Sequence, residues 1–159
     1  RAVAAAAAAT VAAEDGPDLI DMLAPEPPPH AIDEERLPGV YHLGLHQTST
    51  IGVSPYLIVR PEGNVMVDVP AWSRPLAERL DELGGANYLI LTSGEMTEGH
   101  EAWKEWYPDL VRVLHEFDMR SDLKPQKLEQ VLQGSGPWQV GGNGGDGTLR
   151  LLHTPGRTF

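Results

Sequence analysis

Cysteine is absent from this 159-residue chain. Its absence excludes disulfide bonds, iron–sulfur ligation, thiolate zinc sites and cysteine nucleophiles. The redox environment in which the protein works is left undecided, because no thiol reports on it.

Basic residues are also scarce. The chain has 12 Lys and Arg against 23 Asp and Glu, so its formal net charge is −11. Non-specific attraction to duplex nucleic acid needs a basic stripe, and no window of this sequence provides one. We therefore expect no nucleic-acid partner and no attraction to anionic membrane surfaces.

Long hydrophobic runs are missing as well. The longest, from Ala2 to Ala13, is about a dozen small residues interrupted by Thr10. A helix that spans a bilayer needs roughly 20 apolar residues. The sequence thus predicts a soluble protein without a transmembrane segment.

Residues 1–36 differ in composition from the rest. They carry eight of the acids and only two of the bases, and nine of the first thirteen residues are alanine, with four prolines following at 25–29. Such a segment has few large apolar side chains to bury, so we expect residues 1–36 to be a disordered, Ala/Pro-rich acidic leader. An alanine-rich start with an arginine suits the remnant of a chloroplast transit peptide, whereas the lack of serine and the acids favour a plain solvated linker on a cytoplasmic protein. Both interpretations stay open.

From Leu37 onward, short apolar segments alternate with turn residues. Residues 56–67 predict a β-hairpin, because two apolar segments flank the turn sequence Pro-Glu-Gly-Asn. Residues 73–85 predict a helix. A serine and a proline mark its start, leucines recur at i, i+4 and i+7, and a Gly-Gly pair marks its end. Further strands are expected at Tyr88–Leu91, Leu110–Phe117, within Leu128–Val140 and at Thr148–Leu152, with a second helix from near Thr97 to Pro108. This order is typical of a mixed α/β fold.

Three segments carry a resemblance to a known family: YLIVRPEGNVMVDVP (56–70), YLILTSGEMTEGHEAW (88–103) and LLHTPGRTF (151–159). They resemble the N-terminal half of the metallo-β-lactamase fold superfamily, in particular its plant and cyanobacterial branch. The resemblance implies that residues 37–159 form an α/β partial domain, the N-terminal portion of an αββα sandwich. Members of the superfamily hold one or two zinc or iron ions at one edge of that sandwich.

The resemblance also implies positions for the metal ligands. Asp68 matches the aspartate that ends a strand in the family, and His100 matches the last histidine of a T-H-x-D-D-x-x-D-H run. Glu95 is a conservative match to one acid of that run, and Glu98 lies nearby. If a zinc or iron site exists, these are its expected ligands: His100, Glu95 and Asp68, with Glu98 as an additional candidate.

Other ligand positions have been replaced. Ser93 stands where the run has its first histidine, Gly99 where it has its last aspartate, and Arg157 where the family has the histidine of T-P-G-H-T. A catalytic zinc or iron site needs at least three ligands around an open position. A guanidinium cannot deprotonate, so Arg157 would bring a fixed positive charge toward the metal, and it would pair with Asp68 if the two loops meet.

The leading hypothesis is therefore a non-catalytic relative of these hydrolases, without a metal cofactor, with an interaction or scaffolding role. The alternative is a zinc- or iron-dependent hydrolase of a small ester, thioester or lactone with an irregular ligand set. A third hypothesis is an acidic binding module that acts through the leader. Because superfamily domains extend beyond this length, we also expect either an incomplete copy of the fold or a protein partner or homo-oligomer that completes the sheet.

Overall fold

The computed structural model describes residues 27–46, 54–119, 128–141 and 149–154. A seven-stranded sheet forms its centre, and every strand lies next to its neighbour in the sequence. The first four strands pair antiparallel and the last four pair parallel. The strands are β1 (His30–Asp33), β2 (Leu37–His42), β3 (Tyr56–Ile58), β4 (Val65–Val67), β5 (Tyr88–Ile90), β6 (Val111–His115) and β7 (Gln130–Leu132).

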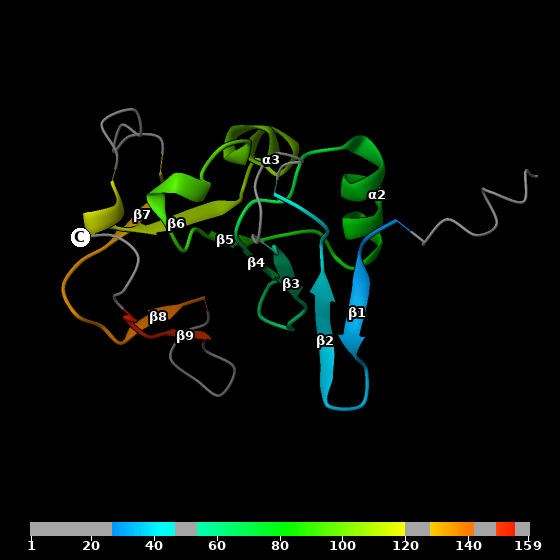
Figure 1. The fold of residues 1–159 in the computed structure, drawn as a ribbon, viewed down its shortest axis with the longest axis horizontal. Coiled ribbons are helices and arrows are strands. Elements are labelled where there is room, and N and C mark those ends of the chain that lie inside the picture. Colours follow the sequence, from blue (N-terminus) through cyan, green and yellow to red (C-terminus); the bar gives the residue numbers. More distant parts are fainter. Residues whose placement is uncertain (1–26, 47–53, 120–127, 142–148, 155–159) are drawn as a thin grey trace, which may run out of the picture.

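Two helices connect the parallel strands. α2 (Arg74–Glu82) joins β4 to β5, and α3 (His100–Trp106) joins β5 to β6. A separate antiparallel pair, β8 (Trp138–Val140) and β9 (Leu149–Leu151), follows β7. In Figure 1 both helices lie on one side of the sheet and the β8–β9 pair lies on the other. None of the helices within the described ranges is long and apolar enough to cross a membrane.

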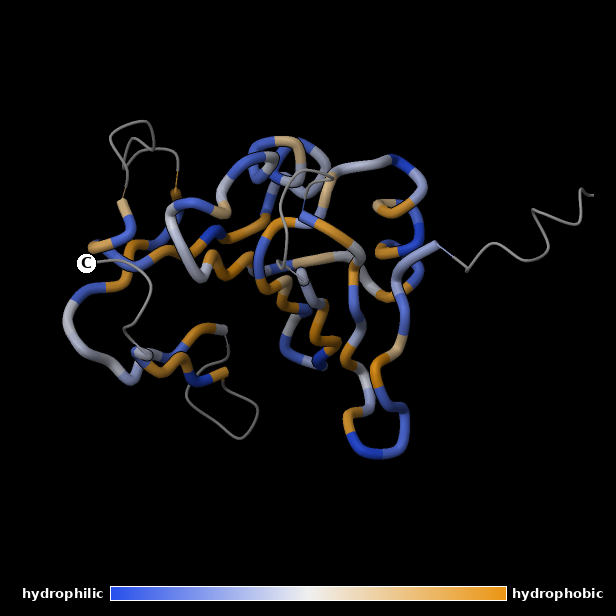
Figure 2. The backbone as a smooth tube through the Cα atoms, in the orientation of Figure 1, coloured by the Kyte–Doolittle hydropathy of each residue, from blue (hydrophilic) through white to orange (hydrophobic). Residues whose placement is uncertain are grey.

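Side chains that alternate along the parallel strands form two hydrophobic cores. Leu89 and Leu114 face the helices, whereas Ile90 and Val113 face the β8–β9 pair. Figure 2 shows hydrophobic segments gathered along these central strands. Strands covered on both faces read as continuous apolar runs, which is what the sequence of β5 shows. The mixed α/β fold expected from the sequence is confirmed.

Local signals in the sequence explain how α2 begins and ends. The hydroxyl of Ser73 accepts a hydrogen bond from the amide of Leu76 at 3.3 Å and so caps the first turn. At the other end Gly84 and Gly85 have φ angles of 96° and 69°, and the Gly85 amide donates to the carbonyl of Leu80. Left-handed backbone favours glycine, so this pair ends the helix as predicted. The hairpin of β3 and β4 is likewise confirmed, with Leu57 opposite Met66.

The start of the sheet needs a correction. The sequence placed the domain boundary at Leu37, but β1 at His30–Asp33 already pairs with β2, with Ala31 opposite Tyr41. An edge strand of this kind is held by main-chain hydrogen bonds and stays largely exposed, so it needs no apolar alternation to mark it. Residues 1–26, where the leader is expected to be disordered, lie outside the described part of the chain.

Asn64 joins the hairpin, the end of α2 and the start of β5. Its side-chain amide donates to the carbonyls of Leu83 and Gly85, each at 2.8 Å, and its side-chain oxygen accepts from the amide of Arg60. Its main-chain amide and carbonyl both bind Asn87. Because Asn64 is only 4% exposed, water cannot replace these partners.

The substitution Asn64→Ala removes three side-chain hydrogen bonds and leaves the carbonyls of Leu83 and Gly85 without this donor. We expect the free energy of unfolding to fall by about 3 kcal/mol, as measured by urea unfolding followed by circular dichroism. The exposed control Glu82→Gln, at the end of α2, should change it by less than about 0.5 kcal/mol. A loss below about 1 kcal/mol for Asn64→Ala would contradict the role assigned to this residue.

Candidate functional site

The carboxyl ends of the parallel strands lie at one edge of the sheet. Asp68 follows β4, Thr92 follows β5, and a 3₁₀ turn at Glu116–Asp118 follows β6. In α/β proteins such edges collect polar side chains on a rigid support and commonly carry the functional site. The ligand positions expected from the family resemblance fall on the first two of these segments and on the start of α3.

Asp68 ties the ends of β4 and β5 together. Its carboxylate accepts hydrogen bonds from the main-chain amide of Thr92 at 2.9 Å and from the Thr92 hydroxyl, which lies 2.8 Å from both carboxylate oxygens. Its own amide donates to the carbonyl of Ile90. Asp68 has a φ angle of 58°, a left-handed conformation that aspartate tolerates better than most residues. The carboxylate is thus engaged in holding a strained strand end.

The loop after β5 uses its polar groups to hold itself. The Ser93 hydroxyl accepts from the amide of Glu95 at 3.2 Å, and the Thr97 hydroxyl donates to the carbonyl of Gly94. The Gly94 amide donates to the carboxylate of Asp118, at 3.4 Å. Ser93, which stands where the family has its first histidine, is buried and caps a 3₁₀ turn at Gly94–Met96.

The residue before α3 has a purely conformational role. Gly99 precedes the helix with a φ of 85°, a value that a glycine reaches without strain. The family has an aspartate at this position, and glycine supplies no side-chain donor atom. Glu95 and Glu98, on either side of Thr97, have exposed side chains.

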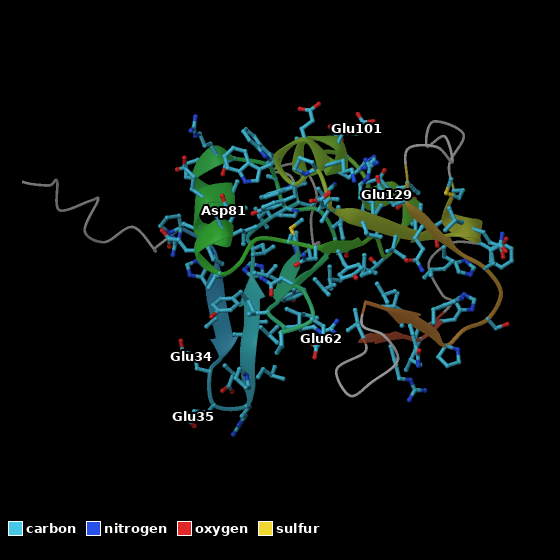
Figure 3. The ribbon with its side chains drawn as sticks, turned by 180° about the vertical axis from the view of Figure 1, so that it is seen from behind. Glu34, Glu35, Glu62, Asp81, Glu101 and Glu129 are labelled. Carbon is cyan, nitrogen blue, oxygen red and sulfur yellow. The ribbon has the colours of Figure 1, made fainter. Side chains whose placement is uncertain are left out.

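His100 is the first residue of α3 and is only 5% exposed. Its Nδ1 lies 2.9 Å from Nη1 of Arg112, which is itself 6% exposed on β6. The guanidinium also makes a two-pronged contact with Glu129, from Nε at 2.9 Å and from Nη2 at 3.0 Å. Lys104, from α3, adds a contact to the same carboxylate at 3.1 Å. Figure 3 shows Glu129 close to the sheet, whereas Glu101 points outward from α3.

The two cations set the charge of Glu129. Burial raises the pKa of Glu129. The hydrogen bonds from Arg112 and Lys104 lower it, and their combined effect is larger, so the pKa falls to about 2. Glu129 is therefore ionised at neutral pH and balances the charge of Arg112. Neither residue was expected at the site from the sequence. The available signal was an arginine inside the apolar strand sequence VRVLH, where a buried charge requires a partner.

These contacts do not fit a catalytic metal centre. Among the residues that the structure describes, no three His, Asp or Glu side chains lie close enough together to hold a metal ion. The carboxylate of Asp68 is engaged by Thr92, and a guanidinium lies one hydrogen bond from His100, where it would repel a divalent cation. Arg157, and with it the expected ion pair to Asp68, lies outside the described residues. The metal assignment of Asp68, Glu95, Glu98 and His100 stays a prediction.

Comparisons with known proteins bear on the fold. No protein-family model matches the sequence, and no curated protein sequence matches it. Among solved structures, the metallo-β-lactamase GOB-18 from Elizabethkingia meningoseptica matches with a TM-score of 0.53 at 22% identity, over 76% of this chain and 50% of that one. The class B3 di-zinc metallo-β-lactamase LRA-12 from an Alaskan soil metagenome matches with a TM-score of 0.52 at 20% identity, over 76% and 51%.

The mixed sheet with two crossover helices is thus of a known class. The chain has the metallo-β-lactamase fold and corresponds to its N-terminal portion, as the resemblance predicted. It spans about half the length of these two structures. Identities of this size establish the fold and leave the reaction open.

The role assigned to Asp68 can be tested by a matched pair of substitutions. Asp68→Asn keeps an acceptor oxygen and a side chain that tolerates the left-handed backbone, so we expect a loss of about 1 kcal/mol in the free energy of unfolding. Asp68→Ala removes all acceptors and leaves the strain, so the loss should be about 2 to 3 kcal/mol. Urea unfolding measures both. The role is disproved if the asparagine variant is as unstable as the alanine variant.

The ion pair of Glu129 predicts a dependence of stability on pH. Its pKa is lower in the folded protein, so its contribution is fully present above the ordinary value of 4.5 and is lost as pH falls toward about 2. At pH 7 Glu129→Gln should lower the free energy of unfolding by about 2 kcal/mol, less than the full shift implies because the side chain is 30% exposed. The difference from the unmodified protein should shrink between about pH 5 and pH 2. Urea titrations at pH 7, 5 and 3 measure it, and a constant difference would contradict the assignment.

Proposed function

We propose that this chain is a non-catalytic protein with the metallo-β-lactamase fold, which binds no metal cofactor and acts as an interaction or scaffold protein. One observation carries the proposal: the polar groups at the carboxyl edge of the sheet and beneath the start of α3 bind one another. Asp68 binds Thr92, and His100 binds Arg112.

The chemistry of the donor set supports the same conclusion. A catalytic zinc or iron ion needs three or more nitrogen or oxygen ligands and one open position. Along the loop that should supply them, Ser93 caps a turn and Gly99 has no donor atom. Glu95 and Glu98 have exposed carboxylates, and the imidazole of His100 is already bound to the guanidinium of Arg112.

An interaction role agrees with the surface around the end of β6 and along the outer side of β7. Phe117 in the turn after β6 is 76% exposed, and its ring lies 5.0 Å from that of His115. β7 is the last strand of the sheet in the described part of the chain, so its outer edge offers main-chain donors and acceptors. A protein partner or a second copy of the chain that adds a strand there is the form of interaction we propose.

Metal content is the measurement that tests the proposal. The folded chain, dialysed against low micromolar zinc or iron and then against metal-free buffer, should retain less than about a tenth of an equivalent by mass spectrometry. Circular dichroism verifies that the protein remains folded. Ester and thioester substrates should be hydrolysed no faster with added zinc or iron than without it.

The control is His100→Ala, which should give the same low metal content. The rival function, a metal-dependent hydrolase, predicts about one equivalent of metal in the unmodified chain, its loss in His100→Ala, and a metal-dependent rate of hydrolysis. That result would overturn the proposal and assign Asp68, Glu95, Glu98 and His100 as ligands.

A further inference from the structure

We infer that the guanidinium of Arg112 is an internal cation that takes the place of a metal ion toward His100 and fixes its tautomer. The inference rests on the proposed function, because it explains how the family position at His100 is used when no metal is bound. It concerns the protonation of one ring nitrogen, which can be measured independently of metal content.

The direction of the hydrogen bond determines the tautomer. A guanidinium has only donors, so the contact of 2.9 Å from Nη1 requires that Nδ1 of His100 be the acceptor. A neutral imidazole whose Nδ1 accepts carries its proton on Nε2. Nδ1 therefore has its lone pair directed at Arg112, and Nε2 has a proton in place of a lone pair. In this state neither nitrogen can ligate a metal ion.

A doubly protonated ring does not fit the same contact. It would bring N–H against N–H at 2.9 Å and a second positive charge next to a guanidinium that is 6% exposed. A guanidinium group does not lose its proton in proteins. The contact therefore admits one form of His100, the neutral ring with its proton on Nε2.

The guanidinium is held in place from its other side. Glu129 accepts from Nε and Nη2, and its Oε2 also accepts from the main-chain amide of Arg112 at 2.9 Å. Lys104 binds the same carboxylate and donates to the carbonyl of Leu110 at 2.8 Å. The carboxylate on one side and the imidazole nitrogen on the other thus form a cation-binding site that is shaped for a planar, two-pronged donor.

The first experiment uses the unmodified chain. Nitrogen-15 NMR of the imidazole groups at pH 7.5 should show His100 as a single neutral tautomer, with Nε2 protonated and Nδ1 unprotonated. The signal is assigned by its disappearance in His100→Gln, and His42→Gln on β2 is the matched control that leaves it in place. A ring with its proton on Nδ1, or a doubly protonated ring, overturns the inference.

The second experiment removes the internal cation. Arg112→Ala leaves Glu129 and Nδ1 of His100 facing a space of guanidinium shape, so low millimolar guanidinium should raise the midpoint of thermal unfolding in a saturable manner, by a few degrees. Urea at the same concentration should not. Arg74→Ala is the matched control, because Arg74 forms an exposed ion pair with Glu78 on α2 and its loss creates no site for guanidinium.

Each further outcome decides between the possibilities. Zinc at micromolar concentration that stabilises Arg112→Ala and has no effect on the unmodified chain also supports the inference, because it shows a cation site opened by loss of the arginine. Stabilisation of neither variant by either cation overturns the cation-site assignment. If Arg112→Ala does not fold, the NMR measurement on the unmodified chain still decides the tautomer. Low metal content with the wrong tautomer would overturn this inference and leave the proposed function standing.

Discussion

The amide side chain of Asn64 fixes the register on which the candidate site depends. It binds the end of α2 on one side, while the main-chain atoms of the same residue bind Asn87 at the entry to β5. With that anchor, Val65 pairs with Tyr88 and Val67 with Ile90. A slip of one residue would turn every side chain of β5 to the opposite face. The meeting of Asp68 with Thr92 at the far end of the same two strands therefore depends on a contact at their beginning.

The charge balance beneath α3 is the opposite of that of the whole chain. The chain as a whole has an excess of acids, yet the site beneath α3 contains two cations, Arg112 and Lys104, around one carboxylate, Glu129. An ion pair of low exposure is weak evidence for stability, because desolvation offsets much of the attraction. Such a group is better understood as a device that specifies one arrangement of side chains. Here that arrangement fixes the orientation of His100 at the start of a helix.

Much of the fold could be predicted because its signals are local. The Pro-Glu-Gly-Asn turn, the Ser cap and the closing Gly-Gly pair each act within a few residues, and the apolar run of β5 reports burial on both faces. β1 was missed because an exposed edge strand is held by its main chain. At the site, the resemblance singled out Asp68 and His100 as candidates, an assignment that stays a prediction. Their partners could not be read from the sequence, because Thr92 and Arg112 meet them only through the parallel pairing of β4, β5 and β6.

The order of the strands has a consequence for how the molecule forms. All seven strands of the main sheet lie beside their neighbours in the sequence, so no strand has to insert between two that are already paired. As the chain leaves the ribosome, each new strand finds the edge of the growing sheet already in place. The sheet can therefore be assembled during synthesis, one strand at a time, from the amino-terminal side.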